Sequence, residues 1–402
     1  MADRLLVLGA GPAQLGLLAA ARRRALFVIA VDRDPGAPGF RYADRRAILS
    51  AEDEPGIHRL AEAEEVDGII APGIDWPVAI AARVAERLGV PHPLAPATAV
   101  LATSKVPQRQ RLAEAGVPQP RWTLTASPVE GVELPCVVKA PDRQGQRGLT
   151  LVRSRSELVP AVQEAVAASR SGSCIIEELA DGPEVTVNGF STNGAYHPLT
   201  VTDRLTADPP AFGVALAHVW PSALAEAAAT GAGETAARAV AALGIENGPT
   251  YTQLRVGADG PMVIEVAARL GGGHDAELCE AALGVDLNGL ALDAALGAAD
   301  AQDIDARPRL GGACTRFLVA PPGELDGVAG LDEARAAPGV LAVHVYRAPR
   351  HRFGPLRIGS DRAGAVLATG ASRGEAVARA HAAADLVRFE VVHAETEVLA
   401  ET

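Results

Sequence analysis

Several features that would mark a membrane, secreted or zinc-stabilised protein are missing from this chain of 402 residues. No apolar run approaches the ~20 residues that a membrane-spanning helix needs. The four cysteines include no CxxC pair, which argues against a disulfide framework and a structural zinc site. The N-terminal residues lack the apolar core and small-residue cleavage site of a secretory signal. We therefore expect a cytoplasmic protein without a membrane partner.

Positive charge is also scarce. The formal net charge is −12, so a cationic surface that would attract nucleic acid is not expected. Of the 37 lysines and arginines only two are lysines, Lys105 and Lys139. A chain that otherwise uses arginine should keep lysine where a guanidinium cannot replace a compact ammonium, as in phosphate coordination. The alternative is that both lysines are chance survivors of a biased composition.

At roughly 150 residues per domain, the length predicts two to three domains. The first hundred residues alternate apolar runs with helical patterns, which predicts a doubly wound α/β layer. The first run ends in the glycine turn from Gly9 to Gly16, and the second ends at Asp32. The turn has the spacing GxGxxxxG and contains Pro12, whereas a dinucleotide-binding turn has GxGxxG. A dehydrogenase that binds NAD(H) at this turn is therefore only an alternative.

Both lysines lie in predicted secondary structure. Lys105 is near the start of a helix that stops at Gly116, and Lys139 is near the end of a strand over 134–140. A polar loop over 142–148 follows, with two arginines and two glycines, and a strand over 149–152 comes next. Such a loop could close over a polyphosphate. The alternative is a solvated hairpin turn.

A second group of polar residues follows at 174–187. A strand pattern ends in Glu177 and Glu178, passes an Asp-Gly-Pro turn and resumes at Glu184. Strand ends of this kind can place backbone groups against a purine edge and a carboxylate against ribose hydroxyls. Taken alone, such acids more often face water.

The stretch from 251 to 274 is the most informative. Two strand patterns flank an Asp-Gly turn at Asp259, which predicts a hairpin. In a symmetric register Gln253 and Glu265 sit opposite each other, and alternation places Arg269 on the face of Glu265. Mg²⁺ prefers a few protein oxygens beside phosphate and water, and an arginine can neutralise charge during phosphoryl transfer. The alternative is a cross-strand Gln–Glu pair with an arginine salt bridge.

Taken in order, these motifs resemble the ATP-grasp superfamily. They are the two lysines, the glycine loop, the run EELADGPEVTV and the run IEVAARLGGG. The segments GAGPAQLG, ASRGEA and EVAARLGGG are most similar to the L-amino-acid ligase branch. The resemblance implies an ATP-grasp fold of the α/β and α+β classes. It implies an N-terminal Rossmann-like preATP-grasp domain over 1–97, an ATP-grasp domain over 98–310 with a small lid subdomain at about 122–188, and a C-terminal lid domain over 311–402.

The resemblance also assigns roles by position. The lysines would bind the α- and β-phosphates, the loop would cover the phosphates, Glu177 and Ala180 would meet the adenine, and Glu184 the ribose. The implied ATP-binding residues are Lys105, Lys139, Gly145, Arg147, Gly148, Glu177, Glu178, Ala180 and Glu184. The implied ligands of Mg²⁺, or of Mn²⁺ in its place, are Glu265 and Gln253. The implied catalytic residues are Arg269, Gly271 and Gly272, and the implied substrate-binding residues are His218, Arg269 and Gly273.

The implied activity is an ADP-forming ligation of a carboxylic acid to an amine through an acyl phosphate, in dipeptide or specialised metabolite biosynthesis. ATP and Mg²⁺ would be the cofactors, a small carboxylate and an amine the partners, and a homodimer the expected assembly, as in related ligases. Two alternatives stay open. One is a carboxylase or formyl-transfer enzyme that acts on a nucleotide precursor, and the other is a nucleotide-binding protein that has lost catalysis.

The chain departs from the family pattern at four positions. Gln253 replaces the usual carboxylate and Ala267 replaces a frequent second ligand, which predicts a weak second metal site. No acidic residue stands near Ala215 to hold an α-ammonium group, and Gly273 replaces a bulky residue of some dipeptide ligases. These two departures predict a larger acyl donor, or one that is not a simple α-amino acid. A Lys139→Ala variant is expected to abolish ATP turnover and to leave the fold intact.

Overall fold

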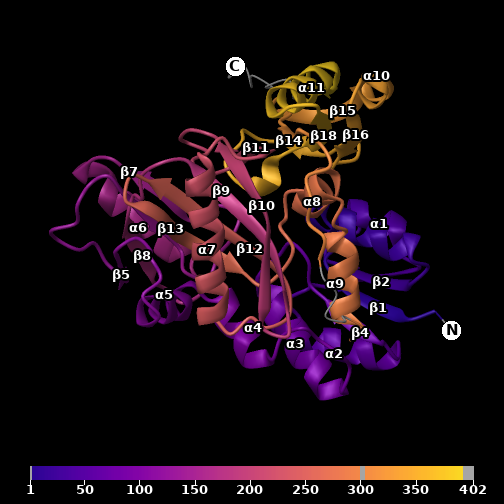
Figure 1. Cartoon of the computed structure of the whole chain (residues 1–402), viewed down its shortest axis with the longest axis horizontal. Helices are drawn as coiled ribbons and strands as arrows, with labels where there is room; N and C mark the ends of the chain where they lie inside the picture. Colours follow the sequence, from indigo (N-terminus) through magenta and orange to yellow (C-terminus); the bar gives the residue numbers. More distant parts are fainter. Residues whose placement is uncertain (1, 299–303, 393–402) are drawn as a thin grey trace, which may run out of the picture.

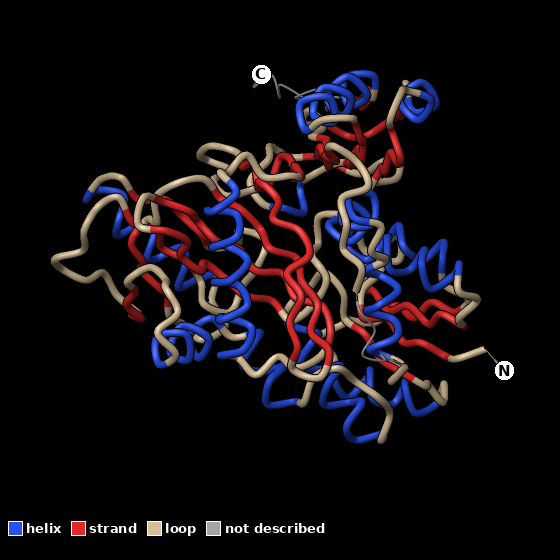
Figure 2. The backbone as a smooth tube through the Cα atoms, in the orientation of Figure 1, coloured by secondary structure: helices blue, strands red, loops and turns tan. Residues whose placement is uncertain are grey.

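The computed structural model describes residues 2–298 and 304–392. Figures 1 and 2 show an N-terminal layer beside α9, a long central sheet, a small sheet at the far side of the central sheet, and a C-terminal unit that contains α10 and α11. Within the described residues, no helix combines the length and the apolar character that a membrane crossing requires.

The N-terminal layer is a parallel four-stranded sheet in the order β3-β2-β1-β4. Its strands are β1 (Arg4–Leu8), β2 (Phe27–Asp32), β3 (Arg45–Ile48) and β4 (Gly68–Ile70). Its helices are α1 (Leu15–Arg23), α2 (Glu54–Ala63) and α3 (Trp76–Leu88), with one-turn helices at η1 (Pro12–Gln14) and η2 (Pro38–Tyr42). The alternating residues of β1 bury both faces: Leu6 and Leu8 pack with α2 and α3, whereas Leu5 and Val7 pack with α1 and α9 (Leu287–Ala295). The predicted doubly wound layer is confirmed. The strand β3 was not predicted, because its residues are exposed or half-buried and form no apolar run.

A small antiparallel sheet has the order β5-β8-β6-β7. Its strands are β5 (Trp122–Thr125), β6 (Cys136–Lys139), β7 (Leu149–Val152) and β8 (Cys174–Glu178). The helix α6 (Arg155–Ala168) packs on it, and α4 (Pro96–Thr103) and α5 (Lys105–Glu114) precede it. The small sheet ends at Glu178, so the predicted subdomain at 122–188 is too long by the strand that follows.

The central sheet has eight strands in the order β13-β12-β9-β10-β11-β14-β18-β16. Five of them precede residue 310: β9 (Glu184–Thr192), β10 (Ala195–Thr206), β11 (Ala215–Trp220), β12 (Gly248–Gly257) and β13 (Gly260–Ala267). The other three are β14 (Gly312–Leu318), β16 (Val340–Val345) and β18 (Gly364–Gly370). The sheet therefore continues across the boundary predicted at 310/311, because β11 pairs with β14. The helices α7 (Glu226–Ala242) and α8 (Asp275–Leu283) lie beside it.

The C-terminal unit adds helices and a small sheet to this end of the central sheet. The elements are β15 (Gly323–Ala329), α10 (Leu331–Ala336), β17 (Arg352–Phe353), η3 (Gly359–Asp361), α11 (Arg373–Leu386) and β19 (Arg388–Val392). The helix α11 buries Ala376 and Ala380 against Cys314 and Ala368. All four cysteines are buried free thiols, as expected of core residues.

Candidate active site

A cavity of about 400 Å³ opens where the N-terminal layer, the central sheet and the C-terminal unit meet. A smaller cavity of about 70 Å³ lies between the small sheet and the β12–β13 hairpin. Gln146, Arg204 and Gln253 line both. The two cavities therefore form one continuous site, with a narrow apolar end and a wide polar end.

The β12–β13 hairpin places Gln253 directly opposite Glu265, so the predicted pair is confirmed. Lys105, at the first position of α5, lies with its Nζ 3.0 Å from Glu265 Oε1 and donates to the carbonyl of Arg143 at 2.6 Å. Burial by itself would raise the pKa of Glu265, but Lys105 and then Lys139 hold it below its ordinary value. Glu265 is therefore a carboxylate at neutral pH.

The hairpin offers a magnesium ion two protein oxygens. No group of three or more His, Cys, Asp or Glu side chains suited to a metal occurs within residues 2–298 and 304–392. Glu265 and Gln253 both line the wide cavity and could offer one charged and one neutral oxygen. Mg²⁺ commonly takes one or two protein carboxylates and completes its octahedron with phosphate and water oxygens. The residues present fit that pattern, with phosphate as the main ligand.

Lys139 and Glu177 form a buried ion pair that also includes Arg109. Glu177 accepts from Lys139 Nζ at 2.6 Å and from Arg109 Nη2 at 2.7 Å, and all three side chains are buried. Arg109 also donates to the carbonyls of Val263 and Ile264. Burial, opposed by Glu177, lowers the pKa of Lys139, while Lys139 and Arg109 outweigh burial and lower the pKa of Glu177.

This arrangement bears on two expectations. Glu177 lines the narrow cavity, but Lys139 and Arg109 occupy its carboxylate, so contact with adenine would use its backbone groups. Lys139 lies at the wall of the narrow cavity and is buried in an ion pair, so we now expect its removal to cost stability as well as activity. Sequence reasoning missed Arg109, although it stands four residues after Lys105 on the same helical face.

The narrow cavity has mostly apolar walls with polar groups at the rim. The walls include Val137, Leu149, Leu179, Ala180, Phe212 and Ile264. Glu184 Oε1 accepts from Arg204 Nη1 at 2.6 Å, so the predicted ribose ligand already has a cation beside it. Glu178 also lines the cavity, but it turns to Arg121, whose backbone N–H donates to it at 2.9 Å. A flat apolar ring fits between such walls.

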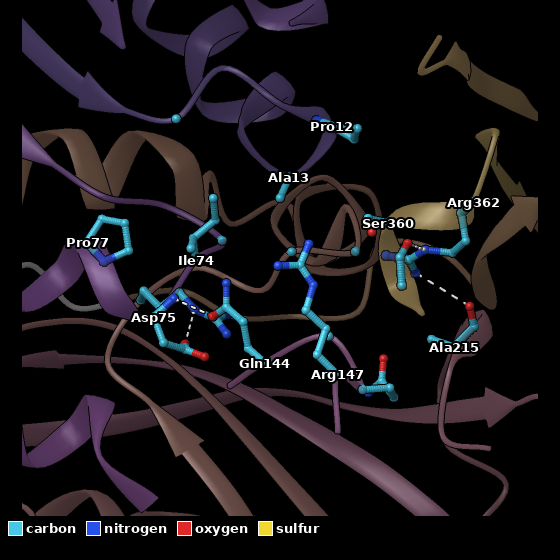
Figure 3. Close-up of a pocket in the computed structure, with 18 of the residues that line it drawn as sticks. Pro12, Ala13, Ile74, Asp75, Pro77, Gln144, Arg147, Ala215, Ser360 and Arg362 are labelled. Atoms are coloured by element: carbon cyan, nitrogen blue, oxygen red, sulfur yellow. Dashed lines mark hydrogen bonds and ion pairs between the residues drawn. The ribbon is translucent and has the colours of Figure 1, made fainter. Parts of the chain in front are cut away.

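The loop over 142–148 lies across the site. The side chain of Gln144 accepts from the backbone N–H of Asp75 at 2.7 Å, and the carbonyl of Gly145 accepts from the N–H of Gly359 at 3.2 Å. Figure 3 shows Gln144 beside Asp75, and Arg147 extended into the cavity. A Cβ on Gly148, which has φ +64°, would come 2.7 Å from the Cβ of Ala168. The loop is therefore a bridge between the N-terminal layer and the C-terminal unit, and not a free hairpin turn.

Arg269, Gly272 and Gly273 line the wide cavity. Arg269 Nε is 2.5 Å from Asp75 Oδ1, and its Nη1 donates to the carbonyl of Leu270. Gly271 permits a close approach, because a Cβ there would come 2.3 Å from Asp275 Oδ2. Gly272 lines the cavity. Asp75 was missed by sequence reasoning, although it follows β4 at the carboxyl end of the parallel sheet, where ligands of α/β proteins gather.

His218 lies on β11 and lines the cavity as predicted. Its Nδ1 is 2.9 Å from Asp275 Oδ1, and the ring meets Phe317 edge to face at 5.5 Å. Asp275 accepts from the N–H of Gly273 at 3.0 Å, and a Cβ on Gly273 would come 2.5 Å from His218 Cε1. Burial opposes the charge of Asp275, but His218 lowers its pKa. Gly273 therefore leaves room for the histidine, and Asp275 orients it.

The N-terminal glycine turn has its polar groups occupied. The side chain of Gln14 fills the space beside Gly9 and donates to the carbonyl of Pro72 at 2.6 Å. Asp32 accepts from the N–H of Ala10 at 2.9 Å. The acid that a dinucleotide would need for its ribose therefore closes the turn, which disfavours the NAD(H) alternative.

The C-terminal unit supplies two arginines that sequence reasoning missed. Arg347 and Arg362 line the wide cavity. Arg362 stacks 3.8 Å above the ring of Phe317 and donates to the carbonyl of Gly359 at 2.8 Å. Among the described residues, no carboxylate lies within 4.0 Å of either guanidinium. This end of the cavity is therefore suited to an anion.

Comparison with known proteins agrees with this geometry. Residues 132–277 match the family described as "ATP-grasp domain", and residues 316–392 match "L-amino acid ligase C-terminal domain 2". The formate-dependent phosphoribosylglycinamide formyltransferase of Burkholderia thailandensis is 32% identical over 186 residues, which are 44% of this chain and 46% of that protein. The match thus spans about half the length of this curated relative.

Two solved structures share the fold over most of the chain. The L-amino acid ligase from Bacillus licheniformis superposes with a TM-score of 0.83 at 24% identity, covering 97% of this chain and 99% of that one. The biotin carboxylase domain of the Hydrogenobacter thermophilus 2-oxoglutarate carboxylase, in complex with MgADP, ADP and bicarbonate, superposes with a TM-score of 0.78 at 17% identity. It covers 97% of this chain and 91% of that one. At these identities the likeness shows the fold.

Proposed function

The chain belongs to the ATP-grasp superfamily, and on that premise we propose that it is an ADP-forming ligase that joins a small carboxylic acid to an amine. One observation carries the proposal. Lys139, Gln253, Glu265 and Arg269 line the two adjoining cavities, and Lys105 contacts Glu265 at 3.0 Å. That combination suits the transfer of a phosphoryl group to a carboxylate.

The residues divide the work by position. The narrow cavity takes the adenine, with Glu184 toward the ribose. Lys105 and Lys139 hold the phosphates, and the loop over 142–148 covers them. Mg²⁺, when bound at Glu265 and Gln253, neutralises phosphate charge. Phosphoryl transfer asks little covalent chemistry of a protein, so positioning and charge dominate.

The proposed reaction has two steps. A substrate carboxylate attacks the γ-phosphate, and ADP leaves. An amine then attacks the acyl phosphate, and phosphate leaves. Arg269 and the backbone N–H groups of Gly271 and Gly272 stabilise the charge that develops on oxygen. His218, oriented by Asp275, lies where the acyl substrate would sit.

Nucleotide product analysis tests the proposal. Purified protein is incubated with ATP, Mg²⁺ and a pool of amino acids and small carboxylic acids, and ADP, AMP and phosphate are followed. Substrate-stimulated ADP and phosphate, without AMP, are expected. ATP binding without ADP release under any pool contradicts the proposal and supports a nucleotide-binding protein that has lost catalysis. In that case Gln253→Glu is the variant expected to restore turnover.

One observation favours a second candidate. Arg347 and Arg362 line the wide cavity without a carboxylate partner among the described residues, and a substrate phosphate would suit them. This supports a formyl-transfer or carboxylation reaction on a phosphorylated precursor, in keeping with the Burkholderia formyltransferase. The same assay distinguishes the two, because ADP release would then require formate or bicarbonate together with a phosphorylated amine.

A further inference from the structure

A buried chain of three polar side chains leads away from the wide cavity and has no place in the chemistry above. Tyr346 follows β16 in the C-terminal unit and lines the cavity. Its hydroxyl is 2.7 Å from His274 Nε2. The other ring nitrogen of His274, Nδ1, is 3.2 Å from Glu277 Oε1. The hydroxyl and the imidazole are both buried.

We propose that Tyr346, His274 and Glu277 form a proton relay that receives the proton of the attacking amine. The proposal rests on the ligase function proposed above. An amine that attacks an acyl phosphate acquires positive charge, and the amide forms only when that nitrogen loses a proton. A group at the cavity wall that passes the proton into the protein meets this need.

One tautomer of His274 suits both of its contacts and gives the transfer a direction. With its proton on Nδ1, His274 donates to Glu277 and accepts from Tyr346 at Nε2. Burial raises the pKa of Tyr346, so the hydroxyl is neutral and acts by passing a proton on. Burial also opposes the charge of Glu277, but the bond from His274 lowers the pKa of that carboxyl. Glu277 is therefore a carboxylate and can stabilise the imidazolium that forms on His274.

The surroundings keep the imidazole in place. His344 stacks on His274 with ring centroids 4.5 Å apart. Burial, assisted by His274, lowers the pKa of His344 to about 3, so this neighbour adds no second positive charge. The other charged groups that act on these three rings are Arg41 and Arg335 near His344, Arg362 near Tyr346, and Glu277 and Asp275 near His274.

Gly16 of the N-terminal turn makes room for the carboxylate of Glu277. A Cβ at Gly16 would come 2.1 Å from Glu277 Oε1, so the glycine leaves room for this carboxylate at the first turn of α1. The positive end of a helix stabilises a carboxylate placed there. The last glycine of the GxGxxxxG turn thus has a use without any dinucleotide. Each of the three units contributes to the relay, through Gly16, His274 with Glu277, and Tyr346.

The step balances as follows. The amine nitrogen forms its bond to the acyl carbon while the bond from that carbon to the phosphate oxygen breaks, and phosphate leaves with the electron pair. The N–H proton passes to Tyr346 Oη as the hydroxyl proton passes to His274 Nε2. The imidazolium later returns this proton to phosphate or water. Tyr346 is the catalytic residue here, and His274 and Glu277 are positioning residues.

An assay with hydroxylamine distinguishes a role in accepting the proton of the amine from a role in forming the acyl phosphate. Hydroxylamine is unprotonated at neutral pH, and because its nitrogen is weakly basic, the cation formed on attack loses its proton readily to water. It can therefore trap the acyl phosphate as a hydroxamate with little need of a base on the protein. Wild type, Tyr346→Phe and His274→Asn are assayed with ATP, Mg²⁺ and the same pool of amino acids and small carboxylic acids, with and without hydroxylamine. Asparagine is chosen because residue 274 has φ +61° and asparagine tolerates the left-handed region. Tyr42→Phe is the matched control, because Tyr42 packs against the same cluster as Tyr346 and stands outside the relay.

In both relay variants we expect hydroxamate formation to persist, while amide formation at pH 7 falls about 10²- to 10⁴-fold, as for lost general acid–base catalysis. Amide formation should recover as the pH approaches the pKa of the amine. Tyr42→Phe should keep both activities. Equal losses of hydroxamate and amide, or no loss of either, overturn the relay alone. A wild type that releases no ADP and forms no hydroxamate overturns the ligase function, and the relay with it.

Discussion

Lys105 Nζ lies 3.0 Å from Glu265 Oε1, so one of the two lysines of the chain neutralises the carboxylate that we assign to the metal. Burial lowers the pKa of Lys105, but Glu265 and Asp75 outweigh it and raise that pKa. On the proposed function, MgATP would replace this pair with two new ones, phosphate beside Lys105 and metal beside Glu265. While the site is free of nucleotide, the ion pair therefore gives each of the two charges a partner of opposite sign.

Because the side chain of Gln253 is a neutral amide, we predict that the site binds Mg²⁺ weakly. A Gln253→Glu variant adds a second charged oxygen opposite Glu265. We expect the Mg²⁺ concentration for half-maximal ADP release to fall about tenfold, which is ~1.4 kcal/mol. Magnesium titration of ADP release is the measurement, with Gln253→Ala as control. An unchanged requirement in Gln253→Glu would place the metal elsewhere.

The buried ion pair of Lys139 predicts a loss of stability as well as of activity. Lys139→Ala leaves Glu177 with Arg109 alone, so the free energy of unfolding should drop by about 3 kcal/mol. The double variant Lys139→Met with Glu177→Gln leaves the buried Arg109 without its carboxylate, so it should regain little of that stability and show no ATP turnover. Urea unfolding and ADP release are measured on each protein. Full turnover in the double variant would remove Lys139 from the phosphate site.

We predict that a substitution at Gly273 impairs use of the carboxylate substrate and leaves nucleotide binding unchanged. In Gly273→Ala the new methyl group would stand 2.5 Å from His218 Cε1 and displace the ring. ATP affinity should be unchanged, while ADP release stimulated by the carboxylate should fall at least tenfold. Gly231→Ala, in α7, is the matched control, because nothing lies within 4 Å of its Cβ. Helix propensity predicts that this control gains about 0.5–1 kcal/mol of stability. Unaltered carboxylate use in Gly273→Ala would argue against His218 as a substrate ligand.

Burial of His92 predicts a stability that depends on pH. Burial lowers the pKa of this imidazole to about 4, whereas in unfolded chains it is about 6.5. Between these values the unfolded chain binds more protons, so stability is lost as the pH falls from about 6.5 to about 4. The loss should reach at most about 3 kcal/mol. His92→Asn removes the titrating ring, so urea unfolding at pH 7, 5 and 4 should show a shallower decline than in wild type. Parallel declines would assign the effect to other groups.

The sequence predicted the parts that depend on local patterns. The β12–β13 hairpin follows from a turn signal between alternating runs. Its register is not symmetric about Asp259, because Gly257 pairs with Gly260, and a register shift between Gln253 and Leu254 brings Gln253 opposite Glu265. The N-terminal layer follows from buried apolar strands with helices between them. Glu265 and Gln253 could be paired because both stand on one hairpin.

The parts that depend on contacts between distant segments could not be predicted. Asp75 meets Arg269 across 194 residues of chain, and no local pattern announces such a contact. Glu177 resembles any strand-end acid until Lys139 and Arg109 are seen around it. Residues 311–392 left few signals for a site because Tyr346 and Arg362 sit in segments without a motif. The sheet that joins β11 to β14 likewise depends on long-range pairing.

The bridge made by the loop over 142–148 sets the order of events. Gln144 holds the N-terminal layer through Asp75, and Gly145 holds the C-terminal unit through Gly359. On the proposed function, a nucleotide that enters beneath the loop would release both ends, and ADP would do so again on leaving. Opening of the loop would therefore expose the nucleotide site and the acyl site at the same time. The closed loop would then shield an unstable acyl phosphate from water until the amine has reacted. The same loop would control both the entry of nucleotide and the hydrolysis of the intermediate.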